Sequence, residues 1–210
     1  MTTYTIYPNV QLGEGYTIGE YCIVGEPPRG RRPGDLATLI GAGATLRSHT
    51  VLYAGNRIGQ HFQTGHGALV REENEIGDDV SIGSHSVIEH HVKIGHGVRI
   101  HSQVFVPEFS ELEDGCWLGP NVVVTNALHP LCPKVKECLK GATVRRGAKI
   151  GAGVVLLPGV TIGEMALIGA GAVVVGDVPA RAVMVGNPAR HIKDIDDLDC
   201  PYGLEAHPYS

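Results

Sequence analysis

The chain has 210 residues, a formal net charge of -5 at pH 7 and 43% hydrophobic residues, enough for a domain with a sizeable core. Its 29 glycines are spread along the whole sequence. They exclude a mostly helical protein, because each interior glycine costs a helix about 1 kcal/mol. The negative charge gives no general attraction to phosphate backbones or anionic lipids. We therefore expect a compact, β-rich fold with no nucleic-acid or membrane partner.

The N-terminal segment and the cysteines indicate the compartment. The first ten residues, MTTYTIYPNV, contain no basic stretch followed by an apolar run, and no run of 18 apolar residues occurs in the chain. Five cysteines, an odd number, argue against a disulfide framework and favour free thiols or metal ligands. We expect a soluble cytoplasmic protein.

An aliphatic side chain recurs at every sixth position over most of the sequence. The series covers residues 12–24, 40–124 and 144–174, and Thr64 breaks the middle run. Glycine follows the aliphatic residue in 13 of the 24 six-residue units, where we expect a turn that uses positive φ. A small residue stands two positions before the aliphatic one in 22 of the 24 units, and Tyr16 and Phe62 are the exceptions.

A period of six fits neither an α-helix nor an ordinary sheet. It fits a three-sided coil of short parallel strands, with the aliphatic side chain pointing inward. Three units make one 18-residue coil, so the 24 units predict about eight coils. Stacked at ~4.8 Å each, they form a prism roughly 40 Å long. The expected fold class is all-β, a parallel β-helix.

Two segments leave the repeat, at residues 26–39 and 125–143, and we expect each to project from the coil as a loop. Beyond the coil, residues 189–198 suggest a short amphipathic helix that caps the open end of the prism. The sequence thus predicts a β-helix domain over residues 1–185 and a C-terminal tail over residues 186–210.

The repeat and the segment after it resemble the hexapeptide-repeat, left-handed β-helix acyltransferases over about residues 10–195. The string Gly-Asn-Pro-Ala-Arg at 186–190 is similar to the G-x-P-A-[KR] signature that follows the last coil in that family. The resemblance implies a left-handed coil, a homotrimer, and an acyl-CoA co-substrate in the groove between subunits. The residues it assigns to the pantetheine amides and the nucleotide end of coenzyme A are Ala152, Gly169, Ala170, Pro188, Ala189, Arg190 and Lys193.

Within that family, residues 100–189 look most like the nucleotide-amino-sugar N-acetyltransferases of bacterial polysaccharide synthesis. The strings IHSQVFVPEFSELEDGCWLGPNVVVTN and MVGNPAR carry this likeness. Ser102-Gln103-Val104 and Glu108 stand where those enzymes usually have Asn-Asn-Val and Asp. The implied activity is acyl transfer to the amine of a nucleotide-linked deoxyamino sugar. O-acylation of a sugar or antibiotic hydroxyl and a non-catalytic trimeric scaffold are the alternatives.

Four polar residues depart from the aliphatic pattern near the expected groove, namely His101, Glu108, Asn126 and His129. Histidine is the natural base near neutral pH, and a carboxylate can orient it or bind the ammonium form of an amine. We favour His101 and Glu108 as the catalytic residues, and Asn126 at the start of the second loop is the third candidate. His129 is the alternative base, and a His101 that merely faces solvent is the structural alternative.

The histidines also allow a different reading. Seven of the eleven lie in residues 61–101, and the string IGHGVRIH, which ends at His101, resembles the metal-binding stretch of gamma-class carbonic anhydrases. That resemblance implies three histidines from two subunits around a zinc ion, whose bound water ionises near pH 7.

The cysteines fall into two groups. Cys22 and Cys116 occupy the small inward position of the repeat, so we expect them in the core. Cys132, Cys138 and Cys200 lie outside the repeat, and together they suggest a structural zinc site that joins the second loop to the tail. His129 is the candidate fourth ligand.

Overall fold

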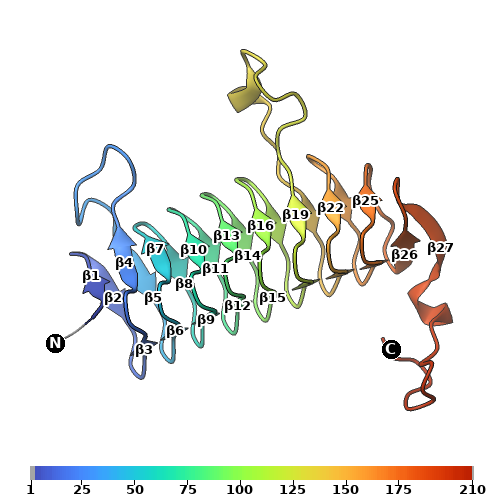
Figure 1. Cartoon of the computed structure of the whole chain (residues 1–210), viewed down its shortest axis with the longest axis horizontal. Helices are drawn as coiled ribbons and strands as arrows, with labels where there is room; N and C mark the ends of the chain where they lie inside the picture. Colours follow the sequence, from blue (N-terminus) through green and yellow to red (C-terminus); the bar gives the residue numbers. More distant parts are fainter. Residues whose placement is uncertain (1–2, 210) are drawn as a thin grey trace.

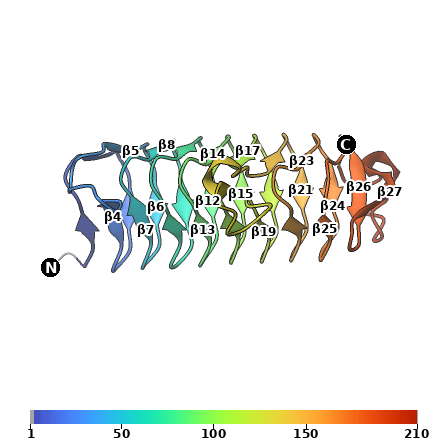
Figure 2. The same ribbon diagram turned by 90° about the horizontal axis from the view of Figure 1, so that it is seen from above.

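The computed structural model describes residues 3–209 as a single coil that advances along one axis from the N-terminus to the C-terminus (Figure 1). Residues 1, 2 and 210, which the two expected parts of the chain include, lie outside the described residues. Three sheets of parallel strands form the sides of the prism, and where no loop intervenes a strand pairs with the strand 18 residues later, as Leu69 does with Val87. Figure 2 shows the coils stacked side by side along the axis. The predicted coil architecture is confirmed.

The strands are short, and from β1 to β25 they are distributed over the three sheets in rotation. The first sheet contains β1 (Thr5–Ile6), β4 (Ile23–Glu26), β7 (Val51–Tyr53), β10 (Leu69–Val70), β13 (Val87–Ile88), β16 (Phe105–Val106), β19 (Val123–Val124), β22 (Val155–Leu156) and β25 (Val173–Val174). The second contains β2 (Val10–Leu12), β5 (Thr38–Ile40), β8 (Arg57–Ile58), β11 (Glu75–Ile76), β14 (Lys93–Ile94), β17 (Glu111–Leu112), β20 (Thr143–Val144) and β23 (Thr161–Ile162). The third contains β3 (Thr17–Ile18), β6 (Thr45–Leu46), β9 (Gln63–Thr64), β12 (Ser81–Ile82), β15 (Arg99–Ile100), β18 (Trp117–Leu118), β21 (Lys149–Ile150), β24 (Leu167–Ile168), β26 (Ala182–Val185) and β27 (Arg190–Asp194).

We call the turns that follow first-, second- and third-sheet strands the first, second and third corners. The aliphatic residue of each unit from 40 to 174 points into the prism and is buried. Thr64 also points inward, where its hydroxyl lies 2.8 Å from the Thr50 hydroxyl, so the break in the ladder is a satisfied polar pair. The large Phe62 side chain is fully buried in the same coil. The inward ladder was therefore predicted correctly from spacing alone.

The glycine after each inward aliphatic residue has a different role from the one we expected. Apart from Gly25, these glycines do not have positive φ; the positive-φ position lies two residues later, at Gly43, Gly67 and Gly97 but also at His61. A Cβ on Gly83 would instead lie 2.4 Å from backbone atoms of the next coil. Glycine is required there because neighbouring coils touch, and not because the turn needs a left-handed residue.

The tail beyond the coil forms a hairpin and not the helix expected over residues 189–198. β26 continues the third sheet beside β24, and β27 pairs with it antiparallel. A single turn of 3-10 helix follows at Ile195–Asp197, and buried Ile195 donates its N–H to the Arg181 carbonyl at 2.7 Å. As a strand, this segment forms backbone hydrogen bonds with the open edge of β26. An isolated helix of about ten residues would be only marginally stable in water.

Both loops leave the prism from the first corner, after β4 and after β19, and in Figure 1 they project in the same direction. The second loop contains one turn of 3-10 helix, Val135–Glu137. Both loops therefore lie on the same side of the prism, at the first corner.

Within the described residues, no helix has the length and apolar character needed to cross a membrane.

Candidate active site

The third sheet presents two hollows on its outer face, and His101 lines one of them and contacts a residue that lines the other. A polar hollow of about 370 Å³ is lined by residues that include Arg99, His101 and Ser102. An apolar hollow of about 540 Å³ is lined by residues that include Trp117 and Leu167. The rings of His101 and Trp117 are in contact, with centroids 4.7 Å apart. His101 therefore stands between a polar compartment and an apolar one.

The backbone of His101 is held firmly although its side chain is exposed. Its N–H donates to the Leu118 carbonyl at 2.9 Å, and its own carbonyl accepts the hydroxyl of buried Ser86 at 2.8 Å. A side chain on such a fixed backbone starts from a defined position, which favours binding and proton transfer over a mobile surface role.

The residues expected to contact the pantetheine arm lie at the third corner. Gly169 and Ala170 line the apolar hollow, and Ala152 lies one coil earlier on the same corner. The N–H of Gly169 already donates to the Met184 carbonyl, and the Ala152 carbonyl already accepts the N–H of Gly171, both at 2.8 Å. These two backbone groups have less to offer a ligand than we expected.

The Gly-Asn-Pro-Ala-Arg segment forms the turn between β26 and β27, beside the apolar hollow. Ala189 is buried, and its N–H donates to the Val173 carbonyl at 2.8 Å, so its role is to anchor the turn. Pro188, Arg190 and Lys193 are exposed, as a nucleotide-binding end requires. The two cations are available to phosphate.

Two residues of the apolar hollow were missed in the sequence. Trp117 and Lys149 occupy outward positions and are paired across neighbouring strands. The Lys149 amine donates to the Gly147 carbonyl at 2.8 Å, and burial lowers the pKa of Lys149. The available signal was their shared place in the repeat, immediately before the inward aliphatic residue, together with the uniqueness of Trp117 as the only tryptophan.

A second polar cluster occupies the first corner, at the base of the long loop. The Asn126 amide donates to Glu108 Oε2 at 2.7 Å, and His90 Nε2 lies 3.5 Å from Glu108 Oε1. Two of the candidate catalytic residues, Glu108 and Asn126, are therefore in direct contact. His90 was missed, although the spacing of 18 residues places residues 90, 108 and 126 on successive coils at one corner.

The surroundings of His90 make this cluster unusual. Its Nδ1 atom is buried and has no hydrogen-bond partner among the described residues. The rings of His91 and Phe109 pack around it at centroid distances of 4.8 and 6.2 Å. Glu89, His90 and Glu108 each offer one potential ligand atom, and these three atoms lie within 4.8 Å of one another. This corner therefore contains donors that could hold a cation.

His101 and Glu108 lie at different corners of the same chain. His101 follows β15 at the third corner, whereas Glu108 follows β16 at the first corner. Seven residues of a three-sided coil carry the chain along a whole side of the prism. His129 is exposed on the long loop, apart from both positions.

The cysteines in the core behave as predicted, whereas the three outside it do not assemble. Cys22 and Cys116 are buried, and burial raises the pKa of the Cys116 thiol to about 12. Cys132 and Cys138 line a small hollow of about 30 Å³ on the long loop together with His129. Cys200 belongs to the C-terminal tail, and the tail as a segment lies away from that loop in both views (Figures 1 and 2). Among the described residues these groups do not come within ligand distance.

The histidines of residues 61–101 are likewise dispersed. His96 lies at the second corner, His90 at the first and His101 at the third. Within the part of the chain that the structure describes, no three of them converge on one point. Residues 3–209 of one chain therefore do not assemble a zinc site from histidines alone.

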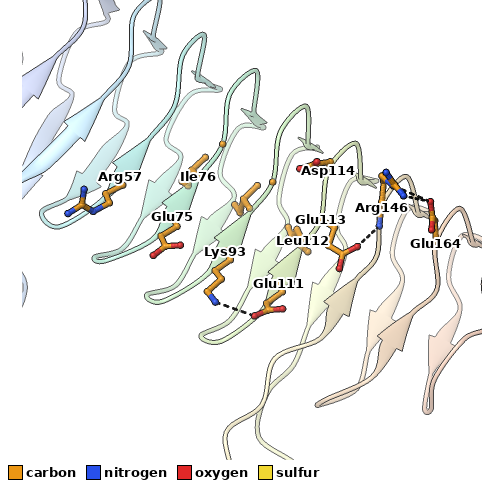
Figure 3. A pocket seen from close by; sticks show the side chains of 13 residues that line it. Arg57, Glu75, Ile76, Lys93, Glu111, Leu112, Glu113, Asp114, Arg146 and Glu164 are labelled. Carbon is orange, nitrogen blue, oxygen red and sulfur yellow. Dashed lines mark hydrogen bonds and ion pairs between the residues drawn. The ribbon is translucent and has the colours of Figure 1, made fainter.

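A third hollow, of about 680 Å³, lies on the second sheet and is lined mainly by charged side chains (Figure 3). Opposite charges pair there along successive coils, with Lys93 3.6 Å from Glu111 and Arg146 3.0 Å from Glu164. Exposed pairs of this kind contribute about 0–1 kcal/mol each. The charged side chains of this open hollow pair with one another, and its lining contains none of the residues expected to carry the chemistry.

A coil of six-residue units that ends in a Gly-x-Pro-Ala turn defines the class of hexapeptide-repeat transferases. The sequence matches the family model described as bacterial transferase hexapeptide (six repeats) at residues 75–108 and 141–176. Nodulation protein L from Rhizobium meliloti is 32% identical over 184 residues, which cover 81% of this chain and 95% of that protein. The chain belongs to the hexapeptide-repeat transferase family.

Two further similarities describe the fold and the length. LpxA, a UDP-N-acetylglucosamine acyltransferase from Bacteroides fragilis, superposes with a TM-score of 0.75 at 17% identity over 91% of this chain and 73% of that chain, which supports the left-handed parallel β-helix. The 2,3,4,5-tetrahydropyridine-2,6-dicarboxylate N-acetyltransferase of Halalkalibacterium halodurans is 41% identical over 131 residues, 62% of this chain and 52% of that protein. The chain thus spans only about half of that relative, and 41% of two other curated acetyltransferases.

Proposed function

We propose that this chain is a cytoplasmic, homotrimeric enzyme that transfers an acetyl or other short acyl group from acyl-CoA to the amine of a nucleotide-linked deoxyamino sugar. The observation that carries the proposal is the apolar hollow at Gly169 and Ala170. It lies beside the Gly-Asn-Pro-Ala-Arg turn and borders His101 through the ring of Trp117. A thioester arm seated there would present its acyl group to the histidine and to the polar hollow beyond.

The proposed chemistry needs two substrates held together and a group that takes a proton. The amine nitrogen attacks the thioester carbonyl carbon, a C–N bond forms, and the C–S bond breaks. His101 accepts the proton that the nitrogen loses and returns it to the departing CoA thiolate. Alignment of the two substrates supplies ~7–11 kcal/mol of the barrier reduction, and a general base adds ~3–5 kcal/mol.

The trimer gives the first corner a place in this proposal. Glu108 and Asn126 lie at a different corner from His101, so they reach an acceptor beside His101 only if the first corner of one subunit approaches the third sheet of the next. The carboxylate would then accept a hydrogen bond from the neutral amine and orient its nitrogen for attack. Light scattering should give three chains per particle, and a stable monomer with full activity would contradict an intersubunit site.

Replacement of Glu108 by alanine is expected to lower kcat/KM for acyl transfer at least about tenfold, because it removes the charge that orients the amine. Steady-state kinetics with the acceptor varied measures this loss. Glu111→Ala is the matched control, since Glu111 is exposed on the second sheet and its carboxylate pairs with Lys93 at 3.6 Å. Equal rates for the two variants would restrict Glu108 to a structural role.

Mass spectrometry of reaction products tests the activity itself. Acetyl-CoA is offered with a panel of amino-sugar nucleotides, together with matched acceptors in which a hydroxyl replaces the amine. A mass gain of one acetyl group on the amine acceptors alone is expected. Transfer to the hydroxyl acceptors would identify an O-acyltransferase, and zinc-dependent hydration of carbon dioxide without any acyl transfer would overturn the proposal.

A further inference from the structure

The C-terminal tail returns to the third sheet through a single aromatic residue. After the 3-10 turn, the side chains of residues 201–208 are exposed, and Tyr202 and Leu204 keep 83% and 84% of their surface open. Tyr209 alone in residues 201–209 is partly buried. A tail that hides one ring while its neighbours stay in solvent is docked at a specific point.

The docking point is the apolar hollow of the candidate site. The Tyr209 ring centroid lies 5.0 Å from Lys149 Nζ, and Tyr209 lines the hollow together with Trp117, Gly169 and Ala170. Cation and aromatic face attract each other at this distance. The Lys149 amine is oriented by its hydrogen bond to the Gly147 carbonyl, so the ring is seated on a fixed cation.

The ring forms a wall of the hollow and does not fill it. About 540 Å³ of space remains with Tyr209 in place, enough for a chain-like ligand segment. The exposed character of residues 201–208 means that little apolar surface must be uncovered when the tail swings away. The tail can therefore open for a ligand and close on it.

We propose that Tyr209 is a binding residue for acyl-CoA, contributed by a tail that opens to admit the pantetheine arm and then closes the aromatic ring over it. This inference rests on the proposed function, because Gly169 and Ala170 belong to the arm's expected path. Trp117, Lys149 and Tyr209 then surround the arm near its thioester end, next to His101. The role of Tyr209 is to retain the acyl donor, with no part in bond making.

Calorimetric titration with coenzyme A measures the role of the ring. Tyr209→Ala is expected to weaken CoA binding about fivefold and to raise KM for acetyl-CoA with kcat unchanged, because the ring contributes uniform binding. Tyr209→Phe should restore wild-type affinity. Tyr202→Ala, a change of the same residue type in the same tail, should leave both quantities unchanged.

The fluorescence of Trp117, the only tryptophan, tests the docked tail without any ligand. Tyr209→Ala is expected to shift the Trp117 emission to longer wavelength, because removal of the ring exposes the hollow. An unchanged emission would contradict the docked state.

The titration with CoA has three further outcomes. Tighter CoA binding by Tyr209→Ala would show that the ring blocks the hollow, and this would overturn the inference. If the wild type binds CoA and Tyr209→Ala binds it equally well, the inference alone fails. If the wild type binds no CoA, the proposed function fails and takes the inference with it.

Discussion

Replacement of His101 by alanine should lower kcat for acyl transfer by a factor of about 10² to 10⁴, the range lost when a general base is removed. The expectation is large because His101 combines three properties. Its backbone is fixed by Leu118 and Ser86, its ring touches Trp117 at the edge of the apolar hollow, and it lines the polar hollow as well. A thioester and an amine brought to these two hollows would meet at its imidazole.

The control for His101 is a histidine on the same corner that lines neither hollow. His66 is exposed, and its Nδ1 lies 2.8 Å from the Ser48 hydroxyl, so His66→Ala should keep wild-type kcat. Thermal unfolding of both variants establishes that the coil is intact. A His101→Ala enzyme with wild-type kcat would show that alignment of substrates suffices, or that His90 at the first corner takes the proton.

The coil could be predicted in detail because one physical rule sets it. An aliphatic residue at Ile82, Ile88 or Ile94 has the same inward position in each sheet, and all three are buried. The repeat also showed where the chain leaves the wall, since both loops begin at a first corner as the breaks in spacing indicated. Inward packing is a local, periodic demand, and periodic demands are visible in a sequence.

The secondary structure of the tail could not be predicted in the same way, because it depends on pairing with β26, a strand that precedes the tail. The amphipathic pattern of residues 189–198 is compatible with a helix, but the open edge of β26 offers backbone hydrogen bonds to a strand. Residues 190–194 have exposed side chains, so no apolar face of their own favours the helix. A tertiary contact therefore determines the local structure.

The candidate site also contains contacts that the repeat makes predictable and contacts that it hides. The contact between Glu108 and Asn126 was predictable in principle, because 18 residues separate them and one coil contains 18. His90 obeys the same spacing and was open to the same argument. Trp117 and Lys149 are 32 residues apart because the long loop intervenes between β18 and β21, so their pairing becomes visible only once the loop is removed from the count.

Replacement of Gly83 by alanine should lower the free energy of unfolding by about 2–3 kcal/mol, although it adds only one methyl group. The new Cβ would lie 2.4 Å from the His101 carbonyl carbon and the Ser102 nitrogen, and backbone atoms cannot rotate away as a side chain would. The neighbouring coil must shift, and this coil contains His101. We therefore expect kcat to fall together with stability.

Chemical denaturation of Gly83→Ala at fixed protein concentration measures the loss, and Gly176→Ala is its matched control. A Cβ on Gly176 meets nothing within 4 Å, and this glycine does not have positive φ, so its unfolding free energy should change by no more than about 0.5 kcal/mol. Equal stability of the two variants would show that the coils separate easily at the third corner. In that case contact between coils would add little to the position of His101, and its hydrogen bonds with Leu118 and Ser86 would hold it alone.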